Sequence, residues 1–341
     1  MSVAELGDGV YLRSFLKPLD PWLTRHDVTE ILINRPQEIW VETNAGARME
    51  RIDVPDLGPT ALSRLAAQVA RVNHQGVSRT NPLLSGLLPG GERIQIIAPP
   101  ATREHLAVAI RKHVSVDLDL ADYAAAGAFA SVRRAGDDDP DRDLRALLVA
   151  GDLLAFFRAA VAARKTILIS GGTSSGKTTF LNAMLKQIAP HERVITIEDT
   201  PEVSLDRPNA LGLVAVRGTT GEANVTPEDL LQAALRMRPD RLLLGEMRGS
   251  EAFSFLRAVN TGHPGSISTI HANSCAGAIE QVALLALQAR VNLGRGEIIA
   301  YARSVIDIVV QLRRSASGQR VVDEVQLIER QPAGSSDQKA T

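Results

Sequence analysis

The sequence predicts an α/β protein of two domains, in which a mainly parallel sheet forms the C-terminal domain and a small α+β domain precedes it. Three observations support this fold class. The chain has 341 residues, enough for two domains at about 150 residues each. Before residue 119, short strand patterns surround a single helix pattern, which is typical of an antiparallel sheet. After residue 145, strand and helix patterns alternate, as they do in parallel sheets covered by helices on both faces.

Short strand-like runs organise the N-terminal part. They recur at 31–33 and 39–41, separated by the turn residues Asn-Arg-Pro and followed by Asn-Ala-Gly. Apolar residues at helical spacing begin at Thr60, and strands return within 93–112. We therefore predict an α+β domain over residues 1–118, built on a meander. The opening segment GVYLRSFLKPLDPWL either lies on a membrane surface or docks on its own domain, and we favour docking.

A stretch of small and acidic residues separates the two domains. Residues 127–143, GAFASVRRAGDDDPDRD, lack periodicity and bury too little apolar area to offset the entropy of ordering. We predict a linker over 119–145, a second domain over 146–330 and a disordered tail over 331–341. The elements expected in the second domain are helix 150–163, strand 166–170, helix 177–188, strand 193–197, helix 227–237, strand 241–244, helix 250–260 and strand 266–270.

Composition argues against several classes of protein. The formal net charge of −1 and the 4% aromatic content do not provide the basic, stacking channel of a DNA translocase, so we expect no direct DNA binding. Cys275 is the single cysteine, which fits a reducing compartment and argues against a Cys-rich zinc module. The sequence shows neither a signal-peptide pattern nor an apolar run of the roughly 20 residues that span a membrane. We therefore expect a cytoplasmic protein with no integral membrane segment.

Residues 171–178, GGTSSGKT, match the phosphate-loop pattern G-x-x-x-x-G-K-[ST]. A strand precedes the run and a helix pattern follows it, whereas a Gly/Ser-rich turn that merely resembles the motif is the alternative. Glycine lets backbone N–H groups face the phosphates, and the helix N-terminus adds partial positive charge. Lys177 would reach the β- and γ-phosphates and Thr178 would ligate Mg²⁺. The expected nucleotide-binding residues are Gly171, Gly172, Thr173, Ser174, Ser175, Gly176, Lys177, Thr178 and Thr179.

Carboxylates follow two of the predicted strands. VITIE ends in Glu198, with Asp199 next, at the sheet edge where ligands of open α/β folds sit. We expect Glu198 to orient or deprotonate the attacking water, whereas a solvated carboxylate or a cap of the following turn is the alternative. Strand 241–244 is followed by Glu246, which we expect to hold the hydration shell of Mg²⁺ unless it only pairs with Arg248.

Two further polar features lie in the same half of the chain. TPED, beginning at Thr226, forms a capping-box pattern with Asp229, which we assign to structure. TGHPGSISTIHANS places His263 before and His271 after a Ser/Thr-rich strand. An imidazole there can donate to the γ-phosphate or link it to a neighbouring subunit. We take His271 as the catalytic candidate, although either histidine can instead be a packing or surface residue, and their spacing does not favour zinc.

Taken in order, GGTSSGKTT, TIEDTPE, LRMRPDRLLLGEMRGSEA and TGHPGSISTIHANS resemble the Walker A, Asp box, Walker B and His box of the secretion traffic ATPases. That superfamily powers type II and type IV secretion and type IV pili. ILINRPQEIWVE, NPLLSGLLPGGERIQI and AIRKH are similar to the N-terminal domain of its VirB-type branch, which serves type IV secretion and conjugation. The sequence also lacks the four-cysteine zinc insertion of type II secretion ATPases.

The resemblance implies a RecA-like P-loop fold for residues 146–330 and a hexameric ring. Each nucleotide then sits between the N- and C-terminal domains, and arginines of the N-terminal domain meet the phosphates. Arg93 of GERIQ and Arg111 of IRK match those positions. Arg133 and Arg134 are weaker candidates, which we expect to pair with Asp137–Asp139 in a solvated loop.

The expected function is that of an ATP- and Mg²⁺-dependent motor of type IV secretion or conjugation. It would power substrate transfer and/or pilus assembly while bound peripherally to the inner membrane through other secretion-system components. A pilus-assembly or tight-adherence ATPase of the same superfamily is the nearest alternative. A non-hydrolysing, nucleotide-sensing scaffold is another, against which the intact Glu198 and Glu246 argue.

Overall fold

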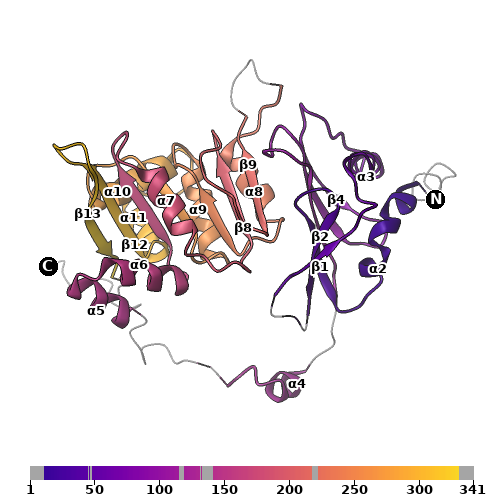
Figure 1. Cartoon of the computed structure of the whole chain (residues 1–341), viewed down its shortest axis with the longest axis horizontal. Coiled ribbons are helices and arrows are strands. Elements are labelled where there is room, and N and C mark those ends of the chain that lie inside the picture. Colours follow the sequence, from indigo (N-terminus) through magenta and orange to yellow (C-terminus); the bar gives the residue numbers. More distant parts are fainter. Residues whose placement is uncertain are drawn as a thin grey trace.

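The computed structural model describes residues 11–44, 46, 48–114, 119–130, 132, 141–216 and 222–329. Within them, a six-stranded and a seven-stranded sheet organise two bodies that follow each other along the chain (Figure 1). The short helix α4 (Leu120–Ala125) lies between them in sequence. Arg133, Arg134 and the predicted tail over 331–341 fall outside the described residues.

The N-terminal sheet has the strand order β3-β2-β1-β6-β5-β4, and every neighbouring pair is antiparallel. Helix α3 (Pro59–Val72) buries an apolar stripe on one face of the sheet, because its apolar residues recur at helical spacing. Leu12, Leu16 and Leu19 are buried in the same core, so the opening segment docks on its own domain, as predicted. The other elements are η1 (Lys17–Leu19), α2 (Asp20–Leu23), β1 (Val28–Ile33), β2 (Glu38–Thr43), β3 (Glu50–Asp53), β4 (Leu83–Leu87), β5 (Arg93–Ile97) and β6 (Ala107–Arg111).

The C-terminal sheet has the order β13-β12-β7-β11-β10-β8-β9 and is parallel except for the β12–β13 pair. Its strands are β7 (Ile167–Gly171), β8 (Val194–Glu198), β9 (Ala210–Val214), β10 (Arg241–Leu244), β11 (Ile267–Ile270), β12 (Ile308–Arg314) and β13 (Arg320–Leu327). The helices are α5 (Arg142–Ala150), α6 (Leu153–Ala162), α7 (Lys177–Leu185), α8 (Pro227–Ala234), α9 (Glu251–Asn260), α10 (Cys275–Leu287) and α11 (Arg295–Val305).

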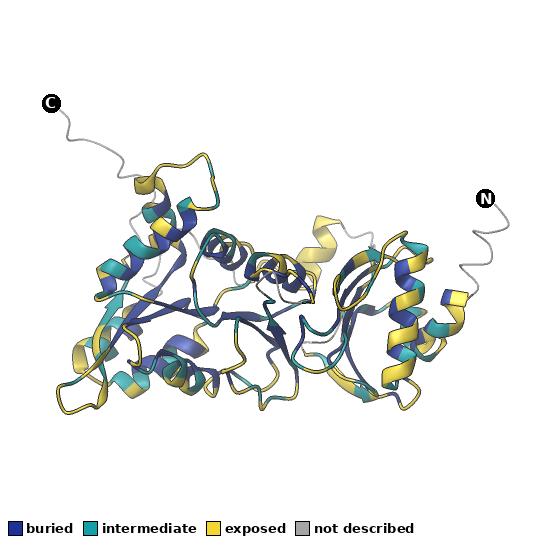
Figure 2. Cartoon of the chain, turned by 90° about the horizontal axis from the view of Figure 1, so that it is seen from above, coloured by how far each residue is buried: buried dark blue, intermediate teal, exposed yellow. Residues whose placement is uncertain are grey.

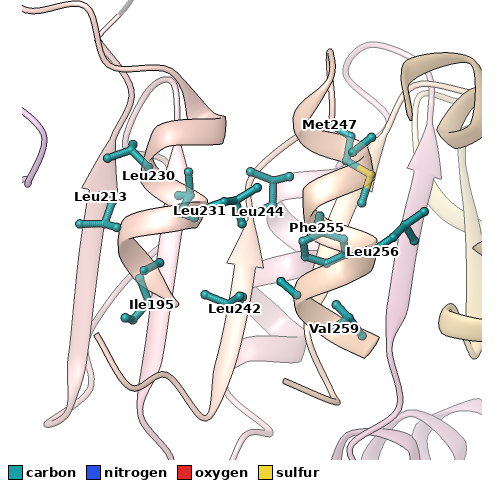
Figure 3. Close-up of a cluster of buried hydrophobic side chains, with 14 of the residues drawn as sticks. Ile195, Leu213, Leu230, Leu231, Leu242, Leu244, Met247, Phe255, Leu256 and Val259 are labelled. Carbon is teal, nitrogen blue, oxygen red and sulfur yellow. The ribbon is translucent and has the colours of Figure 1, made fainter. Parts of the chain in front are cut away.

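Helices cover both faces of this sheet, which explains why its central strands are buried at every position. Leu242 and Leu244 join the core under α8 to α11, whereas Leu243 between them joins the core under α5 to α7. Figure 3 shows Leu231 of α8 and Phe255 of α9 among the side chains that form the first of these cores. The central strands are accordingly buried in Figure 2.

Several elements differ from the sequence prediction. The helix expected at 150–163 is α6, which begins at Leu153, because Gly151 adopts a left-handed φ of 76° that ends the preceding helix α5. α5 begins at Arg142, within the predicted linker. The domain boundaries at 118 and 145 stay predictions. The strands β9, β12 and β13 and the helices α10 and α11 were not predicted. No helix in the described ranges has the length and apolarity that a membrane span requires.

Candidate active site

The phosphate-loop sequence forms the turn from β7 into α7. Ser174 and Gly176 have left-handed φ values of 61° and 95°, which let the chain reverse before the helix begins. A Cβ on Gly171 would lie 2.8 Å from the Leu312 carbonyl oxygen, so only glycine fits beside β12. A Cβ on Gly172 would meet nothing within 4 Å, which leaves that side of the loop open to a ligand.

Lys177 is turned toward its own loop. Its Nζ donates to the carbonyl oxygens of Gly171, at 2.9 Å, and Gly172, at 3.2 Å, and lies 3.3 Å from Nδ1 of His271. Burial lowers the pKa of the Lys177 ammonium, and the nearby Glu246 carboxylate opposes that effect. A phosphate oxygen would offer this ammonium a full negative charge in place of neutral carbonyls.

Glu246, in the loop after β10, connects to the lysine through a histidine. Its Oε1 lies 3.0 Å from Nε2 of His271, and its Oε2 accepts a bond of 2.9 Å from Arg248. That bond raises the pKa of Arg248. The structure therefore brings together the predicted Lys177, Glu246 and His271, and the pairing with Arg248 is also present. His263 lies elsewhere, 3.1 Å from the Pro239 carbonyl oxygen, and burial lowers its pKa.

Glu198 is buried at the end of β8. Its Oε1 accepts from the backbone N–H groups of Glu202, at 2.9 Å, and Val203, at 2.8 Å. Its Oε2 pairs with Arg103 from the N-terminal domain. The carboxylate thus caps the turn after β8, the alternative that the sequence had left open, and it also faces the pocket beside Thr178.

One small pocket joins the loop to the carboxylates. It has a volume of about 100 Å³ and is lined by Thr178, Glu198, Asp199, Thr200, Glu202, Val203, Gly245, Glu246 and Arg248. At about 30 Å³ per water, this space holds roughly three waters, so it suits a partly hydrated ion or one phosphate group. Thr178 Oγ1 donates to Glu202 at 3.0 Å, a partner that the sequence did not indicate. Across the described ranges, no three His, Cys, Asp or Glu residues are grouped to hold a metal.

Arg93 and Arg111 lie away from this pocket. They are register partners on β5 and β6, and with Arg236 and Arg238 they line a second pocket that also contains Glu30. Arg111 Nε lies 3.5 Å from the Glu30 carboxylate. Neither arginine lines the pocket beside Thr178. From the N-terminal domain it is Arg103 that reaches Glu198 within one chain, and no motif had indicated this residue.

A strand, a glycine-rich loop and a helix that starts with lysine and threonine, with carboxylates on neighbouring strand ends, define a P-loop nucleotide-binding protein. The family model described as Type II/IV secretion system protein matches residues 16–340. The type IV secretion system protein VirB11 of Bartonella henselae is 39% identical over 315 residues, which cover 88% of each chain. VirB11 of Brucella suis is 42% identical over 282 residues, covering 81% of this chain and 77% of its own.

A solved structure agrees with these matches. The crystal structure of the VirB11 ATPase from the Brucella suis type IV secretion system in complex with sulphate has a TM-score of 0.88 and 37% identity, and covers 96% of this chain and 97% of its own. The chain therefore belongs to the Type II/IV secretion system protein family, in its VirB-type branch, and is an ATP-hydrolysing type IV secretion ATPase. The predicted fold class and family are confirmed.

Proposed function

We propose that this chain acts as a hexameric, Mg²⁺-dependent ATPase that powers substrate transfer and/or pilus assembly in a type IV secretion system. The observation that carries the proposal is the convergence of Lys177, His271 and Glu246 at the mouth of the phosphate loop. These three groups contact one another in series, so a bound nucleotide can change their contacts. The ammonium and the imidazole can donate to phosphate oxygens, and the carboxylate can bind the metal ion that accompanies the phosphates.

The roles follow from the chemistry of each group. The backbone of residues 171–176 and Lys177 bind the phosphates, and Thr178 with Glu246 hold Mg²⁺, which neutralises developing charge when bound. His271 donates to the γ-phosphate. Glu198 orients or deprotonates the attacking water, and its position beside the Thr178 pocket supports that role.

Arg93 and Arg111 act on the nucleotide of another subunit. Both side chains are exposed, and Arg111 Nε lies 3.5 Å from the Glu30 carboxylate. Neither lines the pocket beside Thr178 in its own chain, which supports a ring in which they reach the phosphate chain of a neighbouring subunit. We further propose that the ring is cytoplasmic and attaches peripherally to the inner membrane through other secretion-system components.

Steady-state phosphate release and nucleotide binding test the site. We expect Lys177→Ala to lose nucleotide binding, because the ammonium is the main charge for the phosphates. Glu198→Gln should keep binding and lose turnover by about 100-fold or more. Lys186→Ala, which removes an exposed lysine at the end of α7, is the matched control and should behave as the wild type. Turnover near the wild-type rate in Glu198→Gln would remove that residue from its catalytic role.

A further inference from the structure

A segment of the N-terminal domain extends the catalytic sheet. Residues 101–103 lie along β9, the edge strand: the Val214 N–H donates to the Ala101 carbonyl oxygen at 2.9 Å. The Arg103 N–H in turn donates to the Gly212 carbonyl oxygen at 3.1 Å. Thr102 and Leu213 form an antiparallel bridge between these bonds. Backbone pairing therefore fixes where the Arg103 side chain starts relative to β8, the strand beside β9.

Gly212 gives the Arg103 side chain room to cross the sheet edge. A Cβ at this position would lie 2.6 Å from Cδ and 2.9 Å from Cγ of Arg103. The aliphatic part of the arginine thus lies directly on the glycine, and its guanidinium reaches Oε2 of Glu198. Any larger residue at 212 would displace the arginine, although the backbone at Gly212 needs no special conformation.

The pair is shielded from water. The side chain of Glu198 is 3% exposed and that of Arg103 is 24% exposed. Two backbone N–H groups hold Oε1 of Glu198 from the C-terminal domain, and Arg103 holds Oε2 from the N-terminal domain. Loss of the arginine would leave a buried carboxylate oxygen without its strongest donor, free to turn or to draw in water.

We propose that Arg103 is a positioning residue for hydrolysis: it holds the Glu198 carboxylate in its working orientation, so the ATPase site is complete only while the N-terminal segment lies on β9. This inference rests on the proposed catalytic role of Glu198. The Arg103–Glu198 contact would link the placement of the N-terminal domain to the rate of ATP hydrolysis. A small displacement of the group that acts on the attacking water lowers that rate strongly.

The test compares kcat and KM for ATP in Arg103→Ala, Arg103→Lys and Gly212→Ala. We expect Arg103→Ala to lower kcat by at least about tenfold and to leave KM within about twofold, since Arg103 does not contact the phosphate loop. Arg103→Lys should recover part of the loss, because it restores the charge but not the planar fork. Gly212→Ala keeps the arginine and displaces it, so its kcat should also fall.

Two further measurements separate positioning from stability. Arg79→Ala removes another arginine that crosses between the domains, to Glu222, but both side chains of that pair are exposed, so its kcat should match the wild type. In a Glu198→Gln background, Arg103→Ala should cause no further loss in single-turnover hydrolysis. An Arg103→Ala variant within about twofold of wild-type kcat, or an equal loss in both backgrounds, would overturn the proposal. Full turnover by Glu198→Gln alone would instead overturn the role of Glu198.

Discussion

Burial changes the pKa of Glu30, which lies next to Arg111. It is 5% exposed on β1, and its Oε2 has no hydrogen-bond partner in the part of the chain that the structure describes. Burial raises the pKa of Glu30 to about 7, and Arg111 partly opposes this effect. The residue therefore changes charge near neutral pH, beside an arginine that we place in catalysis.

This charge change predicts a pH-dependent stability of the N-terminal domain. Between about pH 4.5 and 7 the unfolded chain releases the Glu30 proton while the folded chain keeps it, so stability falls as pH rises, by an amount on the order of 3 kcal/mol. In urea unfolding followed by the fluorescence of Trp22 and Trp40, Glu30→Gln should lose much less stability between pH 5 and 8 than the wild type. The exposed Glu50→Gln is the control, and an identical pH dependence in all three proteins would contradict the prediction.

Site residues that lie within sequence motifs could be predicted, whereas residues that contact them from distant parts of the chain could not. Lys177, Glu246 and His271 were predicted because strand, loop and charge pattern place them on one sheet edge, and they do meet. Arg103 could not be predicted, because it reaches Glu198 across 95 residues and depends on how the two domains pack. Sequence spacing carries no information about such a contact.

Helices and strands were predicted correctly where capping residues or apolar periodicity marked them in the sequence. The capping box at the start of α8 is present, with Asp229 N–H donating to Thr226 Oγ1 at 3.2 Å and Asp229 accepting from the Thr226 backbone. α10 was missed because its residues are apolar on most sides, which hides helical periodicity. β9 was missed because it is short and contains Gly212, and β13 because most of its residues are only half-buried.

Loss of this cap should destabilise α8 without changing the active site. Thr226→Ala removes the acceptor for the Asp229 N–H and should lower the free energy of unfolding by about 1 kcal/mol. Thermal melting followed by circular dichroism measures the effect, and Thr226→Ser, which keeps the hydroxyl, should melt like the wild type. Because α8 anchors Leu230 and Leu231 in the core rather than at the phosphate loop, kcat should not change. Equal melting of Thr226→Ala and Thr226→Ser would show that the cap contributes nothing.

The residues that we propose for catalysis lie in two places that do not meet within one described chain. The phosphate loop and its carboxylates surround one pocket, whereas Arg93 and Arg111 line another together with Arg236 and Arg238. Arg238 is paired with Glu42 and Asp240, whereas Arg93 and Arg111 are exposed and could donate to the oxygens of a phosphate chain. A second copy of the chain can present that phosphate chain if the subunits form a closed ring.

Subunit mixing tests this arrangement directly. The double variant Arg93→Ala/Arg111→Ala keeps its loop, and Lys177→Ala keeps its arginines, so neither should hydrolyse ATP alone. In mixed rings, arginines of the second variant would face intact loops of the first, and phosphate release should recover in part. Mixing Lys177→Ala with Glu198→Gln is the control and should give no recovery, because we place Lys177 and Glu198 in the nucleotide site of one and the same chain. Mass measurement with ATP should show a hexamer; a monomer at micromolar concentration, or mixed rings that stay inactive, would rule out arginines acting between subunits.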